Sequence, residues 1–181
     1  MALTATLHTL RISLNDADRS VYETLELKVA RHPSETMPYM LSRTLAYCLF
    51  WAPDIAFSKG LSTTDEPAVW IKAPDGRVKL WLEVGHPSAE RLHKANKAAE
   101  RVAICSFQEP DAFRRPLVGA RIHRAHEIEL VTLPAEMLEP LTTQVERRMD
   151  WDVAISDGQL YVTTGGQTLS GEIMRAALFE A

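Results

Sequence analysis

Apolar and polar residues alternate along the first thirty positions of the chain. The alternation covers residues 3–14 and resumes over residues 21–29, with the turn-forming segment Asn15–Asp18 between them. A period of two is typical of strands with one buried face, and Asn and Asp favour turns. The pattern predicts an N-terminal β-hairpin within residues 1–32.

The next segment changes to a helical period. Its apolar residues recur three or four positions apart, namely Met37, Met40, Leu41, Leu45, Cys48 and Leu49. Ser34 is a suitable N-cap, and Glu35 would then lie in the first turn, where a carboxylate stabilises a helix. We therefore predict an amphipathic helix over residues 34–51.

Short apolar runs and turn signals organise the rest of the chain. Residues 55–58 read as a strand, residues 59–97 as strand, turn, strand, loop and helix, and residues 101–107 as a strand. The element order over residues 34–107 is α-β-β-β-α-β. A helix follows Pro134, and an antiparallel meander is expected around Asp157-Gly158, ending in a strand over residues 169–178. No linker interrupts the chain, so we predict a single domain over residues 1–181.

The turn Ala73–Gly76 sets the register of the central hairpin. If Ala73 faces Arg77, then Pro67 faces Glu83, and Asp65 faces Gly85. Asp65 and Glu83 would share one face of the sheet, with Glu66 on the other face unless a bulge exchanges them. Two close carboxylates can hold a divalent cation, Mg²⁺ or Mn²⁺. The alternative is that they are strand-end carboxylates neutralised by a lysine or an arginine. A weaker form of it is a structural ion-pair network with Lys59 or Lys94.

A basic helix follows that hairpin. Ser88 is the expected N-cap, and Arg91, Lys94 and Lys97 follow at intervals of three along one side. Such a stripe is usually a solvated helix face. The functional alternative is contact with the phosphates of a nucleic acid.

Composition narrows the function classes. The formal net charge is −4, so nucleic-acid binding would depend on a local basic patch. We find no apolar run of transmembrane length and no export signal, and we expect no membrane partner and a cytoplasmic location. Cys48 and Cys105 lie in separate apolar runs, which predicts buried free thiols.

Three long motifs carry a resemblance to a known family. They are RHPSET at Arg31–Thr36, KGLSTTDEP followed by VW at Lys59–Trp70, and LWLEVG-P with Arg91 and Lys94 downstream. With these motifs the chain resembles the YaeQ family of bacteria, and the similarity runs over essentially its whole length.

The resemblance implies a variant of the restriction-endonuclease-like fold of the PD-(D/E)xK superfamily. The implied fold is α/β (α+β): a mixed central sheet with an αβββαβ core at 34–107, the N-terminal β-hairpin, and a C-terminal helix and antiparallel β-meander at 134–181. In working members of that superfamily, acids stand at positions that match Glu35, Asp65 and Glu83. Gly85 replaces the usual lysine, which makes Lys94 and Lys59 the candidates for that role.

Two functions remain open from the sequence. The first is a metal-dependent phosphodiesterase on DNA or RNA, with Asp65 and Glu83 holding the ion and Lys94 stabilising the transition state. The second is a non-catalytic module that uses the same fold to bind nucleic acid or a protein partner. The missing lysine after Glu83 and the acidic net charge favour the second, whereas the candidate site residues favour the first.

Overall fold

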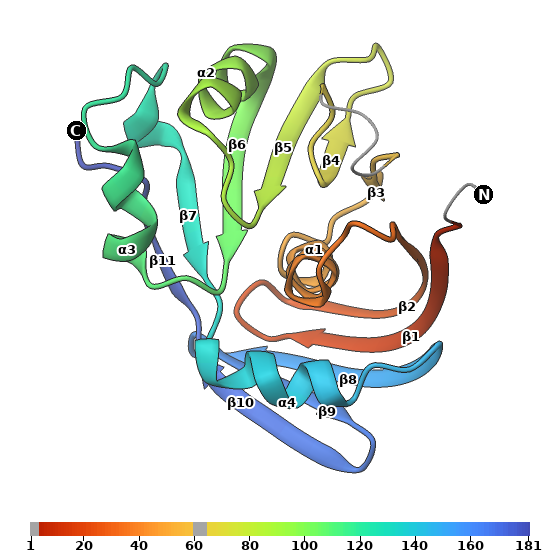
Figure 1. The fold of residues 1–181 in the computed structure, drawn as a ribbon. Coiled ribbons are helices and arrows are strands. Elements are labelled where there is room, and N and C mark those ends of the chain that lie inside the picture. The colour runs from red at the N-terminus through yellow and green to blue at the C-terminus, as the bar shows by residue number, and fades with distance from the viewer. Residues whose placement is uncertain (1–3, 60–64) are drawn as a thin grey trace. The chain divides into compact units, whose positions relative to one another are not determined.

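The computed structural model describes residues 4–59 and 65–181, and the chain forms two compact units. Unit 1 contains the residues up to Trp51 together with Pro134–Ile173, and unit 2 contains Ala52–Leu133 together with Met174–Ala181. Over the described residues, unit 1 has a five-stranded sheet and unit 2 a six-stranded sheet (Figure 1). The single-domain prediction stays a prediction, because compactness of each unit does not decide whether the two unfold together.

The sheet of unit 1 joins the two ends of the sequence. Its strands are β1 (Thr6–Asp16), β2 (Val21–Arg31), β8 (Arg148–Ser156), β9 (Gln159–Thr164) and β10 (Gln167–Glu172). Their order is β10-β9-β8-β1-β2. β1 pairs with β2 as the predicted hairpin, and β8, β9 and β10 form the predicted antiparallel meander. The two halves meet where β1 runs parallel to β8.

The described part of unit 1 also contains two α-helices and one short 3-10 helix. α1 (Met37–Leu49) contacts β2 and α4 (Leu138–Thr143), and η3 (Ala135–Met137) leads into α4 and contacts β10. The leucines of the predicted apolar stripe of α1 are buried. The cap differs from the prediction: the N-cap is Thr36, not Ser34. The backbone of Thr36 is extended, and its hydroxyl accepts a hydrogen bond from the Tyr39 amide. Glu35 therefore precedes the helix.

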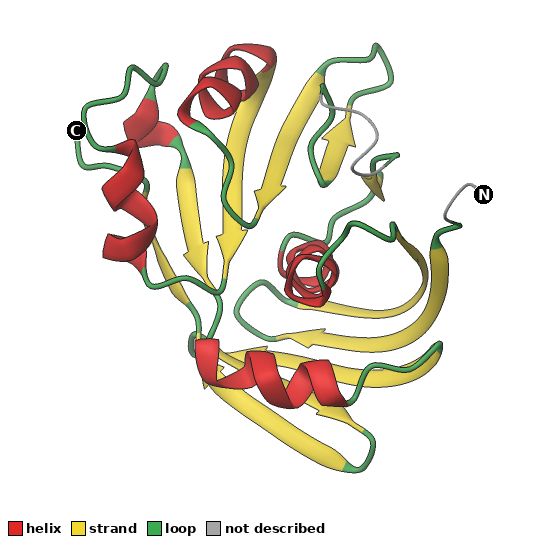
Figure 2. Cartoon of the chain, in the orientation of Figure 1, coloured by secondary structure: helices red, strands yellow, loops and turns green. Residues whose placement is uncertain are grey.

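The sheet of unit 2 is parallel in its middle and antiparallel at its edges (Figure 2). Its strands are β3 (Ile55–Phe57), β4 (Val69–Lys72), β5 (Val78–Val84), β6 (Ala99–Ser106), β7 (Glu129–Thr132) and β11 (Met174–Ala177). The order is β11-β7-β6-β5-β4-β3. With α1 before β3 and α2 (Ala89–Ala98) between β5 and β6, the chain follows the predicted α-β-β-β-α-β order.

Helix α2 packs on β5 and β6. Leu92 and Ala95 from α2 are buried in one apolar cluster with Trp81 of β5 and with Val102 and Ile104 of β6. Short helices complete the unit: α3 (Pro110–Arg114), η1 (Arg115–Leu117) and η2 (Ala125–Glu127). This packing fixes the side of α2 that faces the sheet, and with it the side left for other contacts.

The last predicted strand is wrong as a single element. Residues 169–178 divide between β10 of unit 1 and β11 of unit 2, with Ile173 between them. The amide of Ile173 donates to the carbonyl of Gly158, and the amide of Leu178 donates to the carbonyl of Ile128. Both side chains are buried, so each anchors its own unit. The apolar pattern of residues 169–178 is continuous, so it gave no sign that the chain passes from the sheet of unit 1 to the sheet of unit 2.

The two cysteines are buried and free, as predicted. Burial raises the pKa of the Cys48 thiol to about 12, and it raises the pKa of the Cys105 thiol as well. Both thiols are therefore protonated at neutral pH and unsuited to nucleophilic chemistry. Among the described residues, no helix is long and apolar enough to cross a membrane.

Candidate functional site

Glu83 is a buried acid near the end of β5. Its residue is only 2% exposed. Trp81 lies two positions earlier and therefore on the same face of the strand, and its indole Nε1–H donates to Glu83 Oε1 at 2.7 Å. Arg91 donates from Nε to the same oxygen at 2.6 Å. The carboxylate is thus held by two N–H groups and one positive charge.

Helix α2 brings Arg91 to that position. Ser88 is the N-cap, as predicted, and its hydroxyl accepts from the Arg91 amide at 3.2 Å. With the first turn fixed in this way, the Arg91 side chain bridges α2 and β5. Its Nη2 also donates to the backbone carbonyl of Glu66, so a single guanidinium connects the helix, the strand and the segment before β4.

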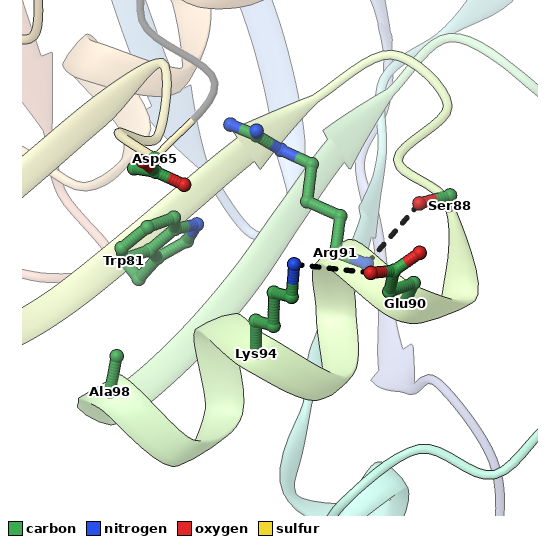
Figure 3. Close-up of a pocket in the computed structure, with 7 residues that line it drawn as sticks. All are labelled: Asp65, Trp81, Ser88, Glu90, Arg91, Lys94 and Ala98. Carbon is green, nitrogen blue, oxygen red and sulfur yellow. Dashed lines mark hydrogen bonds and ion pairs between the residues drawn. The ribbon is translucent and has the colours of Figure 1, made fainter.

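A pocket of about 480 Å³ opens beside this guanidinium. Figure 3 shows Trp81 and Asp65 on one side and the α2 side chains Arg91 and Lys94 on the other. The lining residues among those described are Asp65, Trp81, Ser88, Glu90, Arg91, Lys94 and Ala98. Acids, cations, a hydroxyl and an aromatic ring therefore border one space, which is the mixture of groups found in small-ligand sites.

Lys94 has an exposed partner within the helix. Its Nζ lies 3.1 Å from Glu90 Oε1, and the two side chains are 71% and 77% exposed. Ion pairs between such exposed side chains contribute little free energy, because water solvates each charge almost as well. Lys94 can therefore exchange Glu90 for another anion at small cost.

Burial shapes the acidity of Glu83. Removal from water raises the pKa of its carboxyl above the ordinary value, and the hydrogen bond from Trp81 and the charge of Arg91 offset only part of that effect. The protonated form of Glu83 is thereby made more accessible than for a glutamate in water.

The hairpin register differs by one residue from the prediction. Ala73 and Arg77 are hydrogen-bonded across the turn, as expected. The register then shifts between Ile71 and Lys72, so that Val69 faces Leu82 and Trp70 faces Trp81. An irregularity that adds one residue to β5 moves every later pair, which the turn sequence alone does not encode. The predicted pairs Pro67 with Glu83 and Asp65 with Gly85 are therefore wrong, and β4 begins only at Val69.

The structure brings some predicted site residues together and leaves others apart. Asp65, Arg91 and Lys94 line the pocket, and Glu83 joins them through Arg91. Lys59 is exposed and its backbone amide donates to a carboxylate oxygen of Glu66. Neither Lys59 nor Lys97 is among the described lining residues. Residues 60–64, within one of the family motifs, lie outside the described residues.

Glu35 belongs to unit 1, where it is buried against Arg43. Nη2 of Arg43 lies 2.8 Å from Glu35 Oε1, and Nε of the same residue donates to that oxygen at 3.2 Å. The backbone amide of His32 donates to the other carboxylate oxygen. These contacts connect the end of β2 to α1.

The present arrangement of side chains does not form a ready divalent-cation site. One oxygen of Glu83 accepts from both Trp81 and Arg91, and a guanidinium stands beside the carboxylate where a cation would bind. Asp65 is exposed. Among residues 4–59 and 65–181, no group of three or more His, Cys, Asp or Glu side chains is arranged to hold a metal ion. The Mg²⁺ or Mn²⁺ site stays a prediction.

Four of the described lining residues received no site role from the sequence, namely Trp81, Ser88, Glu90 and Ala98. Trp81 reads as a packing residue, yet it borders the pocket and donates to Glu83. Its spacing of two from Glu83 in a strand was the available signal, because alternation places both side chains on one face. Glu90 had no such signal, since a first-turn acid is common in helices.

Two mixed sheets, with a helix-bordered pocket on one of them, define a small protein of the mixed α+β class. Within that class, the family model described as "YaeQ protein" matches residues 1–173. The chain therefore belongs to the YaeQ family, as its motifs indicated.

Related proteins cover nearly the same length. The chain is 29% identical over 174 residues to the YaeQ protein of Salmonella typhi, covering 93% of this chain and 94% of that one. It is 28% identical over 168 residues to the YaeQ protein of Escherichia coli K12, covering 90% and 91%. Both relatives are described as uncharacterized.

Two crystal structures of YaeQ proteins share the fold. The protein from Pseudomonas syringae is 32% identical with a TM-score of 0.83, covering 94% of this chain and 95% of its own. The protein from Xanthomonas axonopodis pv. citri is 28% identical with a TM-score of 0.86, covering 95% and 98%. The similarity thus spans both units.

Proposed function

We propose that the chain binds a phosphate-bearing ligand of the nucleic-acid type at the α2 pocket, in a nuclease-like fold, without cleaving it while Arg91 holds Glu83. The ion pair of 2.6 Å between Arg91 and Glu83 carries this proposal. In a PD-(D/E)xK nuclease the matching acid would serve the reaction. Here a guanidinium neutralises it, and Gly85 stands where the usual lysine would be.

The cations of the pocket support phosphate binding. Arg91 and Lys94 stand three residues apart on α2, both border the pocket, and Ser88 adds a hydroxyl beside them. An arginine fork and a mobile lysine are the side chains that most often contact phosphate oxygens. Because the net charge is −4, binding is confined to this patch and weakens as salt increases.

The α-β-β-β-α-β order and the family motifs support nuclease ancestry. Descent from a nuclease would explain why a pocket lies beside Glu83, an acid on a strand. It does not by itself imply turnover, because function depends on the site and not on the fold.

Binding is tested by fluorescence anisotropy with a labelled single-stranded oligonucleotide at low salt, in the presence of EDTA. We expect saturable binding that weakens several-fold in Lys94→Ala, with the salt slope reduced by about one. Lys97→Ala is the matched control, because it removes an exposed lysine from the same helix that does not line the pocket. Absence of saturable binding, or equal losses in both variants, would contradict the proposal.

A metal-dependent phosphodiesterase is the second candidate, favoured by the presence of Asp65 and Lys94 around one pocket. It requires Arg91 to leave Glu83. The test is cleavage of single- and double-stranded DNA and RNA with Mg²⁺ or Mn²⁺, by the wild type and by Arg91→Ala. Cleavage that disappears in Asp65→Asn and Glu83→Gln would replace the binding proposal with this one.

Glu35 and Lys59 remain proposals within that second candidate. Lys59→Ala tests Lys59 by loss of cleavage at unchanged stability. Glu35→Gln leaves the buried Arg43 without its charge partner, so a loss of cleavage counts for Glu35 only where circular dichroism shows that this variant is folded. A protein partner is the remaining form of the non-catalytic alternative. It predicts a complex that survives Lys94→Ala, whereas a nucleic-acid site predicts sensitivity to that change.

A further inference from the structure

The pocket has an aromatic side as well as a charged side. Trp81 borders it opposite the α2 cations (Figure 3). Resting on the proposed function, we infer that the pocket accepts one nucleotide unit, with its base against Trp81 and its phosphate at Arg91 and Lys94. The ligand class is then a nucleoside phosphate, supplied either as a free nucleotide or as an unpaired residue of a strand.

The ring of Trp81 is fixed before any ligand arrives. Its Nε1–H is bound to Glu83, and its buried part packs with Leu92 and Ala95 of α2. Only 8% of the residue is exposed, and its exposed part borders the pocket. A ring held in this way loses little rotamer freedom on contact with a base, and the purine and pyrimidine bases all offer a π-face to an aromatic side chain.

The neighbouring tryptophan is placed differently. Trp70 faces Trp81 across the strands, but it is not among the described lining residues. The ammonium group of Lys72 lies 3.6 Å from the centre of its ring, so that ring already has a cation on one face. Trp70 therefore serves as the matched control for Trp81.

Pocket size and the position of Asp65 restrict the ligand further. A volume of about 480 Å³ is within the range of small-molecule sites. A base inside a duplex keeps its faces stacked, so only an unpaired base can contact Trp81. The exposed carboxylate of Asp65 borders the same space and can accept a hydrogen bond from an N–H or O–H of the nucleoside.

The first experiment compares probes on the wild-type chain by calorimetry at low salt. The probes are AMP, ribose 5-phosphate, a short oligoadenylate, and the same oligonucleotide without one terminal base. We expect each base-bearing probe to bind at least about five-fold more tightly than its baseless counterpart. Tighter binding of AMP than of the oligonucleotide identifies a free nucleotide as the ligand, and the reverse identifies a strand end; both support the inference.

Two outcomes overturn the inference and separate it from the proposal on which it rests. If probes with and without the base bind equally, the base contact is wrong and phosphate binding stands. If none of the four probes binds, the proposed function fails together with the inference.

Tryptophan fluorescence locates the base. We expect AMP, or the oligonucleotide, to quench the emission of the wild type and of Trp70→Phe, with most of that quenching lost in Trp81→Phe. Quenching that persists in a folded Trp81→Phe variant would place the base elsewhere and overturn the inference. Circular dichroism shows whether Trp81→Phe is folded. If this variant does not fold, the comparison of probes with and without the base on the wild type decides whether the base contacts the pocket.

Discussion

Each unit contains one glutamate that the sequence suggested for a site, and each glutamate is paired with an arginine. In unit 1 the side chains of Glu35 and Arg43 are 3% and 5% exposed. In unit 2 the side chain of Glu83 is 3% exposed, but that of Arg91 is 28% exposed and borders a pocket. The same chemical pair is therefore sealed in one unit and accessible to a ligand in the other.

Each arginine also contacts a backbone carbonyl. Arg43 contacts both oxygens of Glu35 and also donates to the carbonyl of Ala30, which connects α1 to β2. Arg91 contacts one oxygen of Glu83 and the carbonyl of Glu66. A buried charge pair can be essential without being functional, because removal of one partner leaves a charge without compensation. Only the pair that faces a pocket can exchange partners with a ligand.

Arg43→Met has the largest expected effect on stability. It leaves the Glu35 carboxylate buried without its charge partner, which we expect to lower the free energy of unfolding by about 3–5 kcal/mol. Urea unfolding followed by circular dichroism measures the change. The double variant Glu35→Gln/Arg43→Met removes both charges and should recover much of the loss. A loss below about 1 kcal/mol for the single variant would contradict a structural role.

Arg91→Met should have a smaller effect, about 1–3 kcal/mol. The pocket lets water approach the position of the guanidinium, and Glu83 can take up a proton. The same unfolding experiment, compared with Arg43→Met, measures the contrast between the two pairs. Equal losses in the free energy of unfolding for the two substitutions would show that the different accessibility of the two pairs does not affect stability, which would contradict the comparison.

The pH dependence of stability reports on Glu83. Burial raises the pKa of this carboxyl from its ordinary value of 4.5, against the smaller lowering effects of Trp81 and Arg91. A raised folded-state pKa favours the folded protein below the unfolded-state pKa, and this contribution is lost as pH rises through the folded-state pKa. We therefore expect the wild type to lose stability relative to Glu83→Gln as pH rises above about 4.5, measured by urea unfolding at a series of pH values.

Glu129 supplies the control of opposite sign. Burial acts to raise its pKa, but hydrogen bonds from Arg101 and Arg175 outweigh burial and lower it. Its contribution is present above the unfolded-state pKa and is lost as pH falls through the lowered value. The wild type should lose stability relative to Glu129→Gln on acidification. Parallel trends for the two glutamates would show that the assigned causes are wrong.

Lys94→Ala should have the smallest effect on stability. Its partner Glu90 is exposed, and such a pair within a helix contributes about 0.5 kcal/mol or less. Thermal unfolding of Lys94→Ala and Lys97→Ala should therefore give closely similar midpoints. A large loss confined to Lys94→Ala would indicate a structural lysine, and the binding loss expected for that variant could then not be assigned to ligand contact.

Elements set by local pattern were predictable from the sequence. The hairpin β1–β2 follows from its alternation, and the Ser88 cap follows from hydroxyl chemistry at a helix start. The cap of α1 was misplaced by two residues, because Ser34 and Thr36 are both good caps and only tertiary contacts decide between them.

The site depends on contacts that local patterns do not encode. Arg91 was read as one member of a basic stripe, yet it reaches back to Glu83 across the turn between β5 and α2. The register shift at Ile71 moved Trp81 opposite Trp70. A bulge and a long side chain each act over several ångströms, and neither leaves a periodic signature. The sequence singled out Glu83, whereas its partners Trp81 and Arg91 required coordinates.

The division of the last strand has a consequence for how the chain is made. Strand β1 needs β8 as its parallel neighbour, and the sheet of unit 2 is complete only when Met174–Ala177 joins β7. The ribosome delivers β8 only after residues 1–147 and β11 only after residues 1–173, so each sheet keeps an open edge while those earlier residues are already synthesised. Native pairing of this kind is slow because distant segments must meet. The nascent chain therefore has unpaired strand edges during synthesis, and a chaperone would prevent aggregation most effectively at that stage.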